Sequence, residues 1–140
     1  MTIRKANVKD ADYIVALSKE MGYNPDKSEL IEKVKRIRKD EGNIIYVACN
    51  TSLVGWIHVS LVDPIESSKF AEIRGFVVNR KYRNQGIGTR LILEAENWAK
   101  KKGCKKLRVR TNIIREETRE YYLNKNFKSK KFQEVFDKII

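Results

Sequence analysis

The segment Val78–Arg90 joins an apolar, strand-like stretch to a helix-like one, and its residue types suit the binding of phosphate. Its two glycines, Gly86 and Gly88, stand at the junction, where glycine lets backbone N–H groups approach a ligand closely. The N-terminus of the following helix adds about half a positive charge. Between Glu72 and Glu94 the chain has five basic residues and no acidic one. The pattern therefore predicts a cradle for a pyrophosphate group.

Two common phosphate-binding loops do not match this segment. A Walker A loop needs Gly-x-x-x-x-Gly-Lys-Ser/Thr, which the sequence lacks. A dinucleotide-binding fingerprint needs a third glycine at the position that Leu91 occupies. What remains is the pattern Arg/Gln-x-x-Gly-x-Gly, written here as Arg83-Asn84-Gln85-Gly86-Ile87-Gly88.

With a strand that ends in Phe76-Val77-Val78 before it and an amphipathic helix after it, this loop resembles motif A of the GNAT superfamily of acyl-CoA-dependent N-acyltransferases. A later stretch, Tyr121-Tyr122-Leu123-Asn124-Lys125-Asn126-Phe127, is similar to the superfamily's Phe-Tyr-x-x-x-Gly-Phe motif. Asn126 stands where the motif has glycine, and asparagine tolerates a left-handed backbone better than most residues.

The resemblance implies a role for each matching residue. Backbone groups of Phe76–Val78 would pair with the pantetheine arm of acetyl-CoA, and N–H groups of 84–89 beside Arg83 would hold the pyrophosphate. Tyr122 would protonate the departing thiolate, and Glu72 fits a general base. Many members have an asparagine where this chain has Arg115, seven residues before the tyrosine, and Asn112 is an alternative source of the amide. The cofactor-binding residues so implied are Phe76, Val77, Val78, Arg83, Asn84, Gln85, Gly86, Ile87, Gly88, Thr89 and Arg115.

Plainer interpretations stay open for several of these residues. Glu72 could simply pair with Arg74, Tyr122 could be a packing residue, and Arg115 could be a capping or surface charge. His58, the one histidine, is expected to be a strand residue rather than a base.

The elements that must position these residues follow from hydrophobic periodicity. They give the order βααβββαβαβ(β), a mixed α+β fold in a single domain, 1–140. The resemblance makes this a GNAT-like twisted mixed sheet of six to seven strands flanked by about four helices. Gly75 permits a bulge or a close approach of the backbone. The expected strands are Ile3–Ala6, Asn43–Cys49, Leu53–Val62, Glu72–Val78, Leu107–Thr111 and one or two within Phe127–Ile140; the expected helices begin near Asp10 and Asp26 and span Gly86–Lys102 and Glu116–Asn124.

Composition limits the class of function. Thirty Lys and Arg against 18 Asp and Glu give a net charge of +12, which favours an anionic partner. One histidine and two cysteines outside any Cys-x-x-Cys pair argue against a metal site or a disulfide framework. We expect no membrane span and a cytoplasmic location, because no apolar run approaches the ~20 residues that a span needs.

These observations predict an N-acetyltransferase that moves an acetyl group from acetyl-CoA to a primary amine of a small molecule or peptide, by direct attack in a ternary complex and without a metal. The alternatives are a basic nucleic-acid- or ribosome-binding module and a non-catalytic acyl-CoA sensor. Nucleic acid is not the expected partner, because the chain has no RNA-recognition or zinc-finger signature. A homodimer stays open. The acceptor is not specified, and the acidic residues that could line its pocket are Glu20, Asp26 and Glu29.

Overall fold

The computed structural model describes residues 1–112 and 114–140, which form two compact units, Met1–Val109 and Arg110–Ile140. The described residues contain four α-helices and five strands, a mixed α+β arrangement. In the first unit these are β1 (Thr2–Lys5), α1 (Ala11–Glu20), α2 (Lys27–Lys39), β2 (Asn43–Cys49), β3 (Leu53–Val62), β4 (Phe70–Val78), α3 (Ile87–Lys101) and β5 (Leu107–Val109), with short 3-10 turns at Val8–Asp10 and Arg80–Tyr82.

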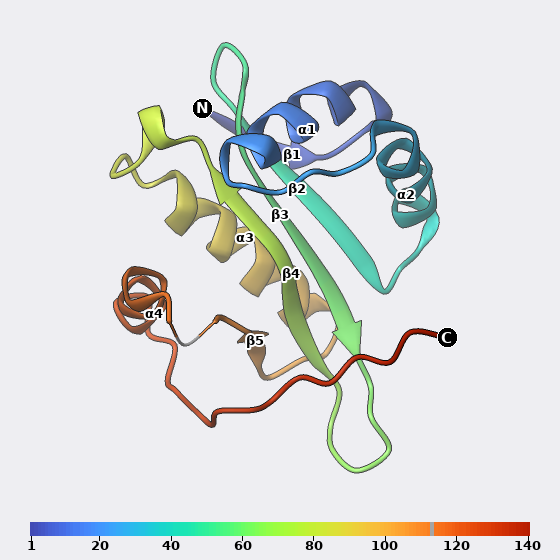
Figure 1. Cartoon of the computed structure of the whole chain (residues 1–140), viewed down its shortest axis with the longest axis vertical. Helices are drawn as coiled ribbons and strands as arrows, with labels where there is room; N and C mark the ends of the chain where they lie inside the picture. Colours follow the sequence, from blue (N-terminus) through green and yellow to red (C-terminus); the bar gives the residue numbers. More distant parts are fainter. Residues whose placement is uncertain (113) are drawn as a thin grey trace. The chain divides into compact units, whose positions relative to one another are not determined.

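The five strands form one sheet in the order β1-β2-β3-β4-β5 (Figure 1). Strands β1 to β4 are antiparallel, and β5 pairs with β4 in the parallel sense. The predicted hairpin between β2 and β3 is confirmed, and its turn is closed by a hydrogen bond from the Asn50 N–H to the Ser52 carbonyl at 2.8 Å.

Helices cover both faces of this sheet, where successive side chains of a strand point to opposite sides. Val47, Trp56 and Val77 are register partners on adjacent strands, and they belong to the same cluster as Ile14 of α1 and Val34 of α2. The opposite face meets α3 at Gly55, where a Cβ atom would lie 3.2 Å from Leu91 Cδ1. In Figure 1, α1 and α2 lie on one side of the sheet and α3 on the other.

The β4 strand contains the irregularity that its glycine predicted. His58 pairs with Gly75, whereas Val59 pairs with Ile73, so Arg74 is an extra residue in β4. A Cβ atom at Gly75 would lie 2.6 Å from Trp56 Cη2, because the indole ring covers this position. Only glycine fits a backbone that a ring approaches so closely.

The second unit contains α4 (Glu116–Leu123) and an extended C-terminal segment. The prediction of one or two strands within Phe127–Ile140 is wrong, and with it the total of six to seven strands: the structure assigns no strand to this segment. A strand needs a hydrogen-bonded neighbour, and α4 is the unit's other regular element among the described residues. The apolar side chains of this segment are therefore exposed, namely Phe132, Val135, Phe136, Ile139 and Ile140.

Candidate functional site

The loop between β4 and α3 has the backbone geometry of an anion-binding turn. After the 3-10 turn Arg80–Tyr82, the chain has positive φ angles at Asn84 (62°) and Gly86 (81°). Turns that combine left-handed and right-handed residues bring successive N–H groups toward one point and form concave sites for anions. The predicted cradle therefore has a backbone that can converge on a phosphate.

The N-terminus of α3 follows directly and adds its own N–H groups. The first intrahelical bond runs from the Arg90 N–H to the Gly86 carbonyl at 3.0 Å, so the N–H groups before Arg90 lie ahead of the helix ladder. Gly86 is the N-cap, and as a glycine it has no side chain that could cap the helix. The first turn contains no acidic residue. This helix end favours negative charge.

The buried face of α3 fixes the position of this turn. Ile87 and Leu91 are 5% and 0% exposed, and both contact the position of Gly55 on β3. A Cβ atom at Gly55 would also lie 3.1 Å from the Val77 carbonyl oxygen of β4. The helix N-terminus is thus held close to the end of the strand that precedes the loop.

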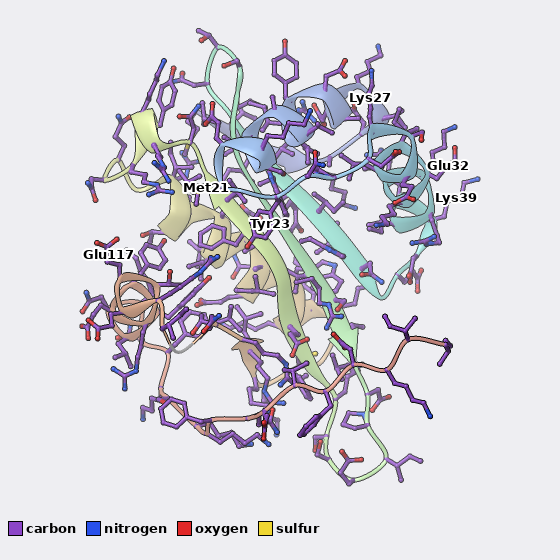
Figure 2. The ribbon with its side chains drawn as sticks, viewed as in Figure 1. Met21, Tyr23, Lys27, Glu32, Lys39 and Glu117 are labelled. Atoms are coloured by element: carbon purple, nitrogen blue, oxygen red, sulfur yellow. The ribbon has the colours of Figure 1, made fainter. Side chains whose placement is uncertain are left out.

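Arg83 connects the loop to the α1 end of the fold. Its Nε donates to the Val78 carbonyl at 3.4 Å, and its Nη2 lies 3.2 Å from Met21 Sδ. Met21 is the C-cap of α1, and Figure 2 shows it at the turn that leaves α1. The structure therefore brings Arg83, the loop and the end of β4 together, and the binding of a pyrophosphate by these residues stays a prediction.

The pairing of β4 with β5 ends before the residues of β4 that are expected to pair with pantetheine. The register with β5 ends at Ile73–Val109, whereas the register with β3 continues to Val78. Phe76, Val77 and Val78 lie in this last part of β4. That arrangement is compatible with an added strand-like ligand, and the pairing itself stays a prediction.

Glu72 is buried on β4 with only 4% of its surface exposed. Arg74, two residues along the same strand, donates from Nη1 to Glu72 Oε2. The pair supplies the partner that a buried carboxylate requires. The plainer interpretation of Glu72, an ion pair with Arg74, is therefore present in the structure, and a role as base stays a prediction.

A chain of three side chains next to this pair was not predicted from the sequence. Asn43 donates from Nδ2 to Asp40 Oδ2 at 2.9 Å, and His58 Nε2 lies 2.8 Å from Asn43 Oδ1. Burial, followed by the charges of Arg74 and Lys33, lowers the pKa of His58 to about 4, so the ring is neutral near pH 7. No sequence motif joins residues from a helix end and two strands, so only the fold reveals this chain.

Tyr122 and Arg115 belong to the second unit. The Tyr122 ring packs edge-on against Tyr121 and Phe127, with centroid distances of 5.4 Å to each. Asn126 has a φ of 67°, so the predicted left-handed asparagine is confirmed. Arg115 is the N-cap residue of α4 and its side chain makes no capping hydrogen bond. The packing of Tyr122 is thus described, while its catalytic role and the cofactor contact of Arg115 stay predictions.

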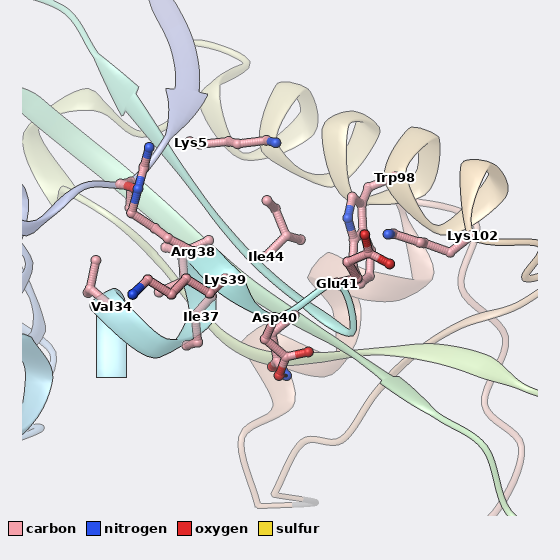
Figure 3. A pocket seen from close by; sticks show the side chains of 13 residues that line it. Lys5, Val34, Ile37, Arg38, Lys39, Asp40, Glu41, Ile44, Trp98 and Lys102 are labelled. Carbon is pink, nitrogen blue, oxygen red and sulfur yellow. Dashed lines mark hydrogen bonds between the residues drawn. The ribbon is translucent and has the colours of Figure 1, made fainter. Parts of the chain in front are cut away.

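A separate cavity of about 390 Å³ lies near the C-terminal end of α3 (Figure 3). Trp98 and Lys102 line it together with α2 residues such as Arg38. Trp98 is eleven residues after Ile87, about 16 Å along the helix at 1.5 Å per residue. This cavity is therefore distinct from the loop at the start of α3.

Neither a metal centre nor a membrane span is found in the described part of the chain. There, no group of three or more His, Cys, Asp or Glu side chains is placed to hold a metal ion. Every described helix is too short or too polar to cross a membrane.

Comparisons with known proteins agree with this geometry. The model of the Acetyltransferase (GNAT) family matches residues 11–127. An aminoalkylphosphonate N-acetyltransferase of Salmonella typhimurium is 26% identical over 134 residues, which are 94% of this chain and 87% of that protein. An uncharacterised N-acetyltransferase of Methanocaldococcus jannaschii is 28% identical over 96 residues, 67% of this chain, but the match spans only 42% of that protein.

A solved structure shares the fold over almost the whole chain. The aminoglycoside N-acetyltransferase AAC(6')-Iy, solved with a bisubstrate analogue of CoA and acetylneamine, superposes with a TM-score of 0.85. It is 19% identical and the match covers 99% of this chain and 98% of that one. The family match over 11–127 includes the loop, α3 and the Tyr122 region in one continuous span. This chain belongs to the acetyltransferase (GNAT) family.

Proposed function

We propose that this protein transfers the acetyl group of acetyl-CoA to a primary amine by direct attack in a ternary complex. The observation that carries the proposal is the turn into α3, where Asn84 and Gly86 have left-handed backbone angles and Gly86 is the N-cap of the helix. A pyrophosphate is the part of acetyl-CoA that such a turn suits. Arg83 adds a positive charge beside the same turn.

Relatives support the two substrates. The AAC(6')-Iy ligand joins CoA to an acetylated amine, and the Salmonella relative is named for acetylating aminoalkylphosphonates. Both names describe amine acceptors. The two acceptors differ in the remainder of the molecule, so the chemical class of this protein's acceptor must be inferred from its own residues.

The reaction needs a free amine and a departing thiol. An amine is protonated near pH 7, so a group must accept its proton before the nitrogen attacks the thioester carbonyl carbon. We assign that step to Glu72, directly or through water. The C–N bond forms, the attacking nitrogen releases its second proton to water, the C–S bond breaks, and Tyr122 gives its proton to the thiolate and regains one from solvent. Because a thiol has an unperturbed pKa of about 8.5, this acid assists a tolerable leaving group.

Binding and turnover test the proposal separately. We expect isothermal calorimetry to detect acetyl-CoA binding and a thiol-release assay over a panel of amines to detect CoA formation. Tyr122→Phe should lower kcat about tenfold or more with an unchanged dissociation constant for acetyl-CoA. Tyr121→Phe is the matched control in the same helix and should leave kcat near its original value. Equal rates for both variants would remove Tyr122 from the chemistry.

Two other functions would be recognised by the same measurements. A nucleic-acid-binding module would bind nucleic acid with an affinity that falls steeply with salt and would give no heat with acetyl-CoA. A non-catalytic sensor would bind acetyl-CoA and release no thiol with any amine. The cytoplasmic location and the homodimer stay predictions.

A further inference from the structure

His58, Glu72 and Arg74 lie on neighbouring strands of the sheet, and Lys33 of α2 adds a positive charge that acts on His58; we call these four residues the His58 patch. Glu72 pairs in register with Ser60, and His58 pairs with Gly75, the residue next to Arg74. Arg74 and Glu72 are joined by their ion pair. His58 is on the same face as Trp56, two residues away along β3. The patch therefore combines neighbouring positions of β3 and β4 with one residue of α2, and all four residues belong to the first unit.

The hydrogen bonds of Asn43 fix which nitrogen of His58 carries a proton. Asp40 has only acceptor oxygens when ionised, so the Asn43 atom that contacts it is the Nδ2 donor. The Asn43 oxygen then faces His58, and Nε2 must donate to it. In a neutral imidazole the other nitrogen, Nδ1, is an acceptor. The patch thus offers one ring acceptor of fixed position.

Arg74 and Lys33 give the patch its positive charge. Arg74 is the extra residue of the β-bulge, and half of its side chain is exposed although one nitrogen bonds Glu72. A guanidinium has five N–H donors, so donors remain for a ligand. Lys33 is an exposed residue of α2. Burial is the main cause that lowers the pKa of His58, and the positive charges of Arg74 and Lys33 lower it further.

The carboxylates at the two ends of α2 already have partners within the protein. Asp26, which could have received a cationic acceptor, accepts the Glu29 N–H at 3.0 Å and the Ser28 hydroxyl at 2.6 Å as the N-cap of α2. Asp40 accepts the Gly42 N–H at 2.7 Å in addition to Asn43. The chain as a whole carries a charge of +12. The net positive charge of the chain disfavours a polycationic acceptor.

We propose that the His58 patch selects an acceptor amine that carries an acidic group, with Arg74 and Lys33 binding the acid and His58 Nδ1 accepting an N–H or O–H of the same molecule. This inference rests on the proposed acetyl transfer for the identity of the acceptor. Carboxylate, phosphate and phosphonate share the required chemistry. Arg74 binds them through paired donors, which a lysine cannot reproduce.

Pairs of acceptors that differ in one acidic group test the proposed acceptor class directly. β-Alanine is compared with β-alaninamide, 2-aminoethylphosphonate with ethanolamine, and spermidine serves as the polycation. We expect kcat/KM to be at least tenfold higher for an acid than for its neutral counterpart, and lowest for spermidine. The preference should shrink as salt is raised, because exposed charges are screened. The carboxylate and phosphonate arms identify which acid is preferred.

Substitutions in the His58 patch test whether its residues cause the preference for acidic acceptors. Lys33→Gln should raise KM for acidic acceptors about threefold with little change for neutral amines, and Arg74→Gln should raise KM for acidic acceptors about tenfold relative to KM for neutral amines. Lys35→Gln is the matched control, because Lys35 is exposed on the same helix and pairs with Glu32 at 3.4 Å. Since Arg74→Gln also leaves Glu72 without this partner, thermal unfolding and acetyl-CoA affinity are measured alongside, and Lys33→Gln provides a variant without that complication.

Failure of the inference and failure of the proposed function give different results. Calorimetry with CoA present ranks the same acceptors without turnover. Turnover with equal or better rates for neutral or polycationic amines overturns the inference and leaves acetyl transfer standing. If no amine is acetylated but acidic amines bind more tightly than neutral ones, the function fails and the acid-binding patch stands. Absence of any binding preference overturns the inference in either case.

Discussion

Replacing Gly86 by alanine tests the turn on which the cofactor site depends. Gly86 has a φ of 81°, and a Cβ atom there would meet nothing within 4 Å. The substitution therefore acts through the backbone and not through a clash. An L-residue in the left-handed region costs about 1–2 kcal/mol, and the stiffer unfolded chain returns about 0.4–1 kcal/mol. We expect a net loss of about 1 kcal/mol of unfolding free energy.

The same substitution should weaken cofactor binding more than it weakens the fold. If the strained turn relaxes, at least one backbone N–H group no longer points toward the pyrophosphate, and its hydrogen bond is lost. A hydrogen bond to a charged group contributes about 1.5–3 kcal/mol. The dissociation constant for acetyl-CoA should therefore rise about tenfold or more, as measured by isothermal calorimetry at fixed salt.

Gly103 provides the matched control at the other end of α3. It has a φ of 83°, and a Cβ atom at this position would also meet nothing within 4 Å, so Gly103→Ala carries a similar backbone cost. We expect urea unfolding to show a similar loss of stability for both variants, and calorimetry to show weaker acetyl-CoA binding only for Gly86→Ala. Equal acetyl-CoA affinity in the two variants would refute the assignment of the turn to the cofactor.

Three further predictions concern the sheet and its neighbours. Protonation of His58 favours the unfolded chain, because the pKa of His58 is 6.5 there and about 4 in the fold. In urea titrations the unfolding free energy of the wild type should therefore fall by up to about 2 kcal/mol between pH 7 and pH 5. The unfolding free energy of His58→Gln should fall by less over the same range. Leu91→Ala should cost about 3 kcal/mol because Leu91 is fully buried, whereas Leu93→Ala, at a site that is 52% exposed, should cost well under 1 kcal/mol. Gly75→Ala should lower the unfolding free energy by about 1–3 kcal/mol, because its Cβ atom would overlap the Trp56 ring. In a Trp56→Leu background, thermal unfolding should show a smaller loss of stability for Gly75→Ala.

Elements with strong local signals were predicted closely from the sequence. The helix expected over Gly86–Lys102 spans Ile87–Lys101, because a continuous apolar stripe and a glycine at each end define it. The Asp26 cap and the irregularity beside Gly75 are also present. In each case the determining interactions lie within a few residues along the chain or between adjacent strands.

Features that depend on distant partners were not predicted. The segment Phe127–Ile140 has enough apolar residues for strands, but pairing requires a neighbour that periodicity cannot supply. The chain Asp40–Asn43–His58 joins the end of α2 to two strands, and nothing in the spacing of these residues indicates it. The cofactor and catalytic roles came from the family resemblance, and binding and turnover assays are what test them.

The short pairing between β4 and β5 has a consequence for amide hydrogen exchange. Three register pairs connect these strands in the part of the chain that is described, whereas eight connect β3 to β4. Protection follows the free energy of local opening, so deuterium should enter β5 well before the β3–β4 ladder. A ligand lying along the last residues of β4 would slow exchange at that end of the strand, which makes deuterium uptake a measure of occupancy that needs no turnover.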